Sequence, residues 1–357
     1  MMIIVAIILF TILIVVHELG HFWAARRNGV EVEEFGIGFP PRLFGRQYKD
    51  TLYSINLLPL GGFVKLKGES DSDRREGSMG AASLWAKTKI LLAGVGMNLV
   101  AAYVIVLALA WTQLPVVIPE QYTVPADEAT AQDAVVVVDV VEDSAAAAAG
   151  LQSGDELRTL QGEDVTSAEV FIDDVAELAP ATVEIEILRD NEPLLKTAEL
   201  EEAENGAGVL GLQPFDFESK RYTWSAPMVA LGVTAQMVGL VFEALGQIGS
   251  GLAGGDPGQA ADQVAGPVGI VAIIQSLGDL GPAYILFLMA SISVPLAVIN
   301  ALPIPALDGG RLAVILGARA LRKQLSENVE AAIHGIGFLA LIGLLILITY
   351  VDIQRFF

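Results

Sequence analysis

The residues with the clearest chemical potential are His17, Glu18 and His21, in the stretch His17-Glu18-Leu19-Gly20-His21 near the end of an apolar run. Histidines four positions apart lie on one face of a helix, so both imidazoles can reach one metal ion. Glu18 lies beside them and can take a proton from a metal-activated water. Zinc suits nitrogen and oxygen ligands and a hydrolytic reaction without redox chemistry. The pattern therefore predicts a hydrolytic zinc site.

A helix end with interfacial histidines and a glutamate that reaches the membrane surface would explain the same residues without a metal. Against this alternative, three ionisable groups within an apolar span need a compensating partner. No other charge within that span supplies one, and two of the only three histidines in the chain are here. These points favour the metal site.

Asp308 is the candidate for the third protein ligand that a catalytic zinc requires. The chain has no cysteine, so any metal must be held by His, Asp or Glu. Asp308 follows Pro303 and Pro305, which break a helix, and precedes Gly309 and Gly310, which permit a tight turn. The alternative is that Asp308 caps the helix that follows.

The elements that carry these residues are predicted membrane spans. The chain is 53% hydrophobic yet has a net charge of −21, which fits spans combined with an acidic soluble insert and argues against a nucleic-acid partner. The segments long and apolar enough to span are 2–25, 89–113, 283–303 and 334–351. The fourth begins at His334, which we interpret as interfacial.

Residues 227–249 are also long enough to span a bilayer. However, Gln236, Glu243 and Gln247 share one helical face, and a carboxylate in hydrocarbon is costly. We therefore predict an amphipathic helix on the outer surface, with a fifth span as the alternative.

Lys and Arg predict the orientation of the spans. Eleven lie between residues 26 and 89 and four between 311 and 323, but only five lie in the long region 114–282. Positive residues collect on the cytoplasmic side, so the N-terminus and region 114–282 are predicted to lie outside. His17, His21 and Asp308 then share a depth near the cytoplasmic side, which favours the ligand role of Asp308 over the cap.

The predicted soluble insert covers residues 121–217. Its strands are predicted at 135–141, 183–188 and 209–212, and a helix at 167–178. Ala149-Gly150-Leu151, Gly154-Asp155 and the following Leu-x-x-Leu-x-Gly resemble a bacterial PDZ domain. This resemblance implies an α/β domain that binds extended peptides by strand addition. The alternative is a tethered domain without a peptide ligand.

A short strand is predicted between Gly62 and Gly68, through Phe63, Val64, Lys65 and Leu66. A zinc hydrolase within a membrane span would meet helical substrates, which must be unwound before the backbone can be attacked because their amides and carbonyls are bonded internally. The strand would offer such a substrate an open edge. The alternative is a plain cytoplasmic hairpin.

These motifs, in this order, resemble the site-2 protease family of intramembrane zinc metalloproteases, in its bacterial branch with a PDZ domain. The resemblance is carried by His17–His21, by the stretch from Asn300 to Gly309, by the insert and by Pro59–Glu69. It implies that His17, His21 and Asp308 bind zinc and that Glu18 is the general base. Asn300 is implied to hold substrate or orient the site, and so is Asn98, although Gly94-Val-Gly-Met precedes Asn98 where relatives carry Gly-Pro.

The predicted fold is therefore a polytopic α-helical membrane protein of about four transmembrane helices with an extracytoplasmic α/β PDZ-like insert. Its parts are residues 1–114, 121–217, 222–282 and 283–357, with the third comprising the surface helix and a linker. The expected partners are the lipid bilayer and single-span membrane proteins such as anti-sigma factors or remnant signal peptides, and the expected location is a bacterial plasma membrane. The competing classes are an inactive membrane scaffold that displays a PDZ domain and a transporter with broken helices.

Overall fold

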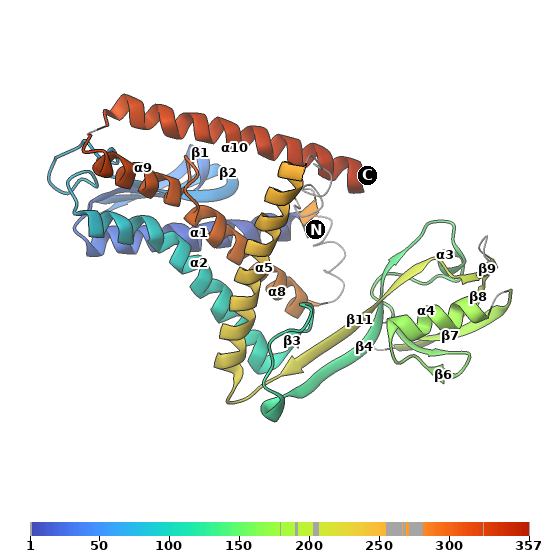
Figure 1. Cartoon of the computed structure of the whole chain (residues 1–357). Helices are drawn as coiled ribbons and strands as arrows, with labels where there is room; N and C mark the ends of the chain where they lie inside the picture. Colours follow the sequence, from blue (N-terminus) through green and yellow to red (C-terminus); the bar gives the residue numbers. More distant parts are fainter. Residues whose placement is uncertain are drawn as a thin grey trace. The chain divides into compact units, whose positions relative to one another are not determined.

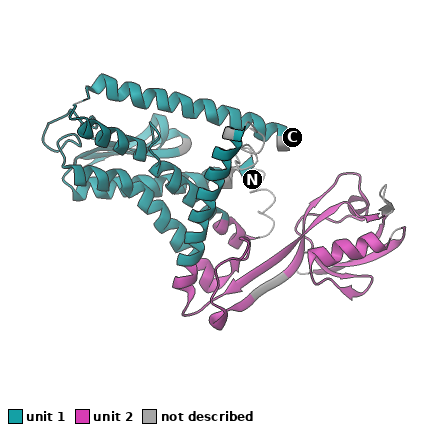
Figure 2. Cartoon of the chain, in the orientation of Figure 1, with its two compact units in different colours: residues 1–106, 231–272, 288–357 teal, residues 107–230, 273–287 magenta. Residues whose placement is uncertain are grey.

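The structure is a computed structural model that describes residues 2–178, 180–189, 192–202, 207–254, 266, 269–270, 281–323 and 325–356. The chain divides into two compact units, shown in teal and magenta in Figure 2. The first unit comprises residues 1–106, 231–272 and 288–357, and the second comprises residues 107–230 and 273–287. All the residues predicted to bind zinc or substrate lie in the first unit.

Five helices among the described residues are long and apolar enough to cross a membrane. They are α1 (Met2–Arg27), α2 (Leu84–Thr112), α5 (Ala226–Gly254), α8 (Pro282–Ala301) and α10 (Glu327–Phe356), labelled in Figure 1. Four correspond to the predicted spans. The remaining helix, α5, covers the stretch 227–249 and meets the criteria for a fifth span, so the number of helices that cross the bilayer stays a prediction.

Helix α10 begins seven residues before the predicted span, and its polar first turns explain why hydropathy missed them. Glu330 accepts hydrogen bonds from Ser70 Oγ and from Asp71 N, each at 3.0 Å. His334, at which the predicted span begins, therefore lies two turns inside the helix. Its Nδ1 accepts a hydrogen bond from Ala306 N at 3.1 Å, which ties α10 to the turn before Asp308.

The strands β1 (Val32–Tyr48) and β2 (Thr51–Leu66) form an antiparallel sheet beside α1. Phe35 lies opposite both Val64 and Tyr53, so the first part of β1 pairs with both ends of β2. The end of β2, residues 62–66, pairs with β1 along one side only. The predicted strand after Gly62 is thus confirmed as an edge segment of this sheet.

The turn between α8 and α9 (Asp308–Ala320) can pack this closely on α9 because two glycines lie in the first turn of that helix. A Cβ atom on Gly309 would overlap the carbonyl oxygen of Ala301, and one on Gly310 would overlap that of Ile304. Backbone atoms cannot yield to such contacts. The predicted break and tight turn before α9 are confirmed.

The second unit holds a seven-stranded sheet in the order β3-β11-β4-β5-β7-β8, with β6 paired to β5. The strands are β3 (Leu114–Pro115), β4 (Ala129–Val140), β5 (Glu156–Leu160), β6 (Glu163–Asp164), β7 (Thr182–Arg189), β8 (Glu192–Glu199) and β11 (Leu212–Arg221). A separate pair is formed by β9 (Glu201–Glu202) and β10 (Gly208–Val209).

Two helices, α3 (Ala145–Ala148) and α4 (Ala168–Glu177), pack on this unit around a core that includes Phe171, Val183 and Ile185. Helix α4 begins after Ser167, whose side chain accepts a hydrogen bond from Val170 N. The predicted α/β insert and its helix at 167–178 are confirmed. The boundaries 121–217 stay a prediction. The last strand of the sheet, β11, extends beyond residue 217 to Arg221. Most of the predicted linker after Gly254 lies outside the described residues.

Candidate metal centre

His17, His21 and Asp308 converge on one point, although 291 residues separate His17 from Asp308. The Nε2 atoms of His17 and His21 lie 3.0 Å and 3.2 Å from Asp308 Oδ2 and 3.0 Å from each other. Ligand atoms about 2.0–2.1 Å from a tetrahedral zinc lie roughly 3.3–3.4 Å apart. Two imidazole nitrogens and a carboxylate oxygen are also a donor set that zinc accepts. The three residues therefore fit one zinc ion.

The helices present these side chains in the orientation that a ligand needs. His17 and His21 are buried on one face of α1, each 6% exposed. Asp308 is the first residue of α9, and the residue that caps this helix is Leu307, without a side-chain hydrogen bond. The Asp308 carboxylate is thus directed at the histidines, as the ligand prediction requires. Burial opposes ionisation of Asp308, but contacts with His17 and His21 outweigh it and lower the pKa of its carboxyl well below the usual range.

Residues on one face of α2 contact the two histidines. His21 Nδ1 donates to the carbonyl oxygen of Ile90 at 2.7 Å, which leaves Nε2 free for a metal. The Asn98 side-chain amide lies 3.2 Å from His17 Nδ1 and is fully buried. Gly94 lies between them, four residues from each, so Ile90, Gly94 and Asn98 share one helical face.

Gly94 brings the backbone of α2 directly against the histidine rings. A Cβ atom at this position would lie 2.5 Å from His21 Nε2 and 2.6 Å from His17 Nε2. Gly94 was not among the site residues predicted from the sequence. The spacing of Gly94 and Asn98 at i and i+4 is the signal that could have indicated it.

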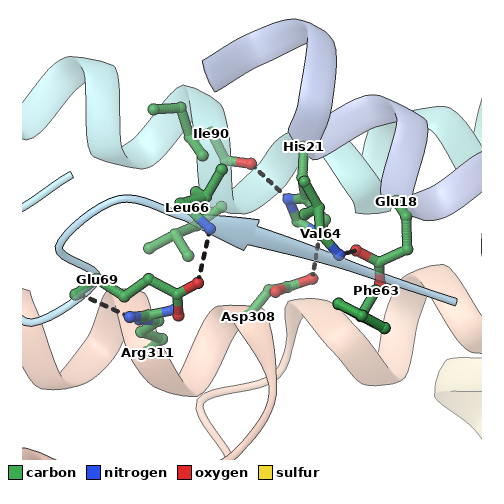
Figure 3. Close-up of a pocket in the computed structure, with 10 residues that line it drawn as sticks. Glu18, His21, Phe63, Val64, Leu66, Glu69, Ile90, Asp308 and Arg311 are labelled. Atoms are coloured by element: carbon green, nitrogen blue, oxygen red, sulfur yellow. Dashed lines mark hydrogen bonds and ion pairs between the residues drawn. The ribbon is translucent and has the colours of Figure 1, made fainter. Parts of the chain in front are cut away.

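A cavity of about 200 Å³ opens beside the three converging residues, and Figure 3 shows it. Glu18 lines this cavity, and its Oε2 accepts a hydrogen bond from Val64 N at 3.0 Å. The other lining residues are His21, Phe63, Val64, Leu66, Glu69, Ile90, Leu91, Asp308 and Arg311. The candidate base and the edge segment of β2 therefore face the same space.

The structure brings three of the seven residues predicted to bind substrate or support the site to this cavity. Phe63, Val64 and Leu66 line it. Gly62 is buried next to them, whereas Lys65 is largely exposed and pairs with Glu33 at 2.8 Å.

Asn300 lies in the last turn of α8, half-buried, and is not among the residues that line the cavity. Glu69 and Arg311 do line it and were not singled out from the sequence. Arg311 follows Asp308 by three residues, and this spacing on one helical face would have pointed to it.

A buried group of two histidines and a carboxylate, with a second carboxylate beside it on an apolar helix, is the arrangement of a membrane-embedded metallohydrolase. Comparison with known proteins agrees. A profile of peptidase family M50 matches residues 5–344. The chain belongs to this family, the site-2 proteases, and is a zinc metalloprotease of the membrane.

Relatives match nearly the whole chain. A predicted zinc metalloprotease of Clostridium perfringens is 34% identical and covers 99% of this chain and 98% of its own length. Zinc metalloprotease RasP of Bacillus licheniformis is 28% identical, with 98% of each chain covered. The regulator of sigma-W protease RasP of Bacillus subtilis is 26% identical, again with 98% of each covered. Family membership favours the protease over the scaffold and the transporter.

Among solved structures, the PDZ domain of an SdrC-like protein from Listeria monocytogenes is 25% identical to the matched part. The match covers 23% of this chain and 88% of that structure, with a TM-score of 0.22.

Proposed function

We propose that this protein cleaves peptide bonds within or beside the transmembrane segments of other membrane proteins. The observation that carries the proposal is the convergence of Asp308 with His17 and His21 beside Glu18. The two histidines and Glu18 lie on α1, which is apolar enough to span the bilayer. His17, His21 and Asp308 would hold zinc, which when bound acidifies water and polarises a peptide carbonyl. Glu18 then serves as the general base, and its Oε2 takes the proton of the attacking water.

Asn98 and Ile90 keep the histidines in the tautomer that a metal needs. A histidine that binds through Nε2 carries its proton on Nδ1, and that proton needs an acceptor. The Ile90 carbonyl supplies the acceptor for His21. For His17 we assign the acceptor to the amide oxygen of Asn98, which faces Nδ1 when the amide is turned by 180°. Asn98 is thereby a positioning residue. For Asn300, the binding of substrate or the orientation of the site stays a prediction.

The substrate is proposed to pair in extended form with the edge segment of β2. An intact transmembrane helix has no free backbone groups to offer, so it must unwind first. Val64 and Leu66 line the cavity next to Glu18, where an unwound segment would lie. Single-span anti-sigma factors and remnant signal peptides are the substrate classes we propose. The name of the Bacillus subtilis relative, a regulator of sigma-W, supports the first.

The proposed location is a bacterial plasma membrane, with the N-terminus and the PDZ-like domain outside and the metal centre toward the cytoplasm. The distribution of Lys and Arg supports this orientation. The broken helix at Pro303 and Pro305 would admit water from the cytoplasmic side, because irregular backbone is tolerated where it borders a water-filled cavity.

Removal of zinc tests the proposal directly. Treatment of the detergent-purified protein with 1,10-phenanthroline is expected to abolish cleavage of a single-span reporter substrate, and stoichiometric zinc is expected to restore it. Asp308→Asn should bind less zinc than wild type in elemental analysis. A wild-type protein that cleaves reporters equally well without bound metal would contradict the proposal.

The inserted domain carries a groove of its own, for which we propose an extended peptide ligand. A cavity of about 320 Å³ lies between α4 and the β10–β11 region and is lined by apolar side chains that include Phe171, Ile172, Val175 and Val209. An apolar groove between a helix and a strand is the type of site at which PDZ domains accept peptides. The insert contains far more acidic than basic residues, which favours a ligand without net negative charge.

Ile172→Asp is expected to weaken binding of a labelled peptide from the outer segment of a substrate by about tenfold, because the peptide would have to desolvate a carboxylate. Fluorescence anisotropy with the full chain in detergent measures this. Leu195→Asp is the control, since Leu195 lies on β8, is exposed and does not line the groove. Equal affinities of the two variants would argue against a peptide at this groove.

A further inference from the structure

The free edge of β2 directs two backbone amides at the cavity, and a carboxylate already occupies each of them. Val64 N donates to Glu18 Oε2, and Leu66 N donates to Glu69 Oε1, both at 3.0 Å. Residues two apart in a strand direct their backbone groups to the same edge. These two amides therefore form the edge at which an extended substrate would pair. Figure 3 shows both contacts beside Asp308.

Arg311 holds Glu69 in this position. One terminal nitrogen of Arg311 donates to Glu69 Oε2 at 2.8 Å, and the other donates to the backbone oxygen of Glu69 at 2.7 Å. Arg311 lies one turn after Asp308 on α9, so both side chains lie on the same face of that helix. The acid that covers Leu66 is thus fixed to the helix that carries the third candidate zinc ligand.

We propose that Glu69 is a built-in competitor of the substrate: its carboxylate occupies the strand-pairing position at Leu66 that an extended substrate must take. The inference rests on the proposed function. A backbone amide provides one donor, so a substrate carbonyl that accepts from Leu66 N has to replace Glu69 Oε1. The displaced carboxylate keeps Arg311 as its partner through Oε2, so the charge of Glu69 stays paired.

The competition gives the site selectivity for segments that are already unwound. Hydrogen bonds from an amide to a carboxylate are stronger than those to a neutral carbonyl. A substrate therefore displaces Glu69 only when several of its backbone groups pair along the edge at once. The same pairing at Val64 displaces the carboxylate of Glu18 and frees it to act as a base, so strand pairing and readiness for catalysis are coupled.

Glu69→Gln tests the inference, because it removes the negative charge and keeps the shape of the side chain. The KM for a single-span reporter in detergent micelles is expected to fall about threefold or more, while kcat changes by less than about twofold. Amide hydrogen exchange at Leu66 should be faster than in wild type. Glu69→Asp, which is one methylene too short to reach Leu66 N, should change KM in the same direction if the Gln variant folds poorly.

Glu31→Gln is the matched control, since Glu31 is ion-paired with Lys67 at 2.9 Å and does not line the cavity. It should leave both KM and exchange at Leu66 unchanged. A KM for both Glu69 variants that equals or exceeds the wild-type value, with normal zinc content, would overturn the inference. If wild type cleaves no reporter, the proposed function fails, and exchange decides alone: equal rates at Leu66 in wild type and Glu69→Gln then overturn the inference.

Discussion

Glu18→Gln is expected to lose cleavage while keeping its zinc. General bases typically contribute about 10²–10⁴-fold to rate, and Gln cannot accept the proton of the attacking water. Glu18 is not among the three residues that converge within ligand distance, so its replacement leaves that group intact. Gln also retains an oxygen that can accept the hydrogen bond from Val64 N. Cleavage of a model transmembrane substrate in detergent and elemental analysis of the same samples give the two readouts.

The combination of readouts separates the roles of the residues in this region. Glu163→Gln, at an exposed position on β6, controls for the loss of one carboxylate and should have no effect. A Glu18→Gln protein that loses zinc along with activity would assign Glu18 to the metal and not to proton transfer. One that keeps both would exclude Glu18 as the base. A wild type that binds no zinc and cleaves nothing, even pre-trimmed substrates, would favour the inactive scaffold.

Gly94→Ala is expected to disrupt the metal centre, although it adds only one methyl group. The added Cβ would overlap both ring nitrogens that converge on Asp308, at 2.5–2.6 Å. The rings cannot move away together and still meet one ion. In a helix interior, alanine normally stabilises by about 0.5–1 kcal/mol relative to glycine, so propensity alone predicts the opposite outcome. Zinc affinity is expected to fall by about 10–100-fold or more, as it does when the groups that support metal ligands are altered.

Gly96→Ala is the matched control, two residues along the same helix. A Cβ at Gly96 would meet nothing within 4 Å. This variant should bind zinc and cleave like wild type, with a slightly higher unfolding temperature. Competition with a chromogenic chelator measures the affinities, and differential scanning fluorimetry measures the unfolding. Equal zinc affinities in the two variants would contradict the close approach of α2 to His17 and His21.

The sequence predicted the parts of the site that depend on local geometry. The spacing of His17 and His21 fixes their common helical face, and two glycines after Asp308 indicate a turn. Spacing places Gly94 on the helical face of Asn98 and Arg311 on that of Asp308, but the contacts that Gly94 and Arg311 make depend on how α2 and α9 pack. Gly94 also carries no functional group, so its spacing alone does not show how closely it approaches the rings.

The fold was predicted unevenly for similar reasons. Long apolar helices were found because hydropathy reports them directly. The sheet of β1 and β2 was predicted only at its last segment, since the double pairing of Phe35 depends on bends that alternation does not show. Helix α5 is long and apolar enough to span a bilayer, but it also contains Glu243. Its composition therefore supports both a surface helix and a span. The start of α10 was missed because its first turns are polar and are held by Glu330 rather than by the bilayer.

The distance in sequence between the halves of the metal centre affects when the enzyme becomes active. His17 and Asp308 are 291 residues apart, and chains are synthesised from the N-terminus, with their domains folding in that order. The histidine pair therefore enters the membrane long before its carboxylate partner has been translated. A chain that has not been translated as far as Asp308 lacks the proposed third ligand, so we expect it not to cleave membrane proteins at the site of insertion. Proteolytic activity is expected only after Asp308 has joined the histidine pair.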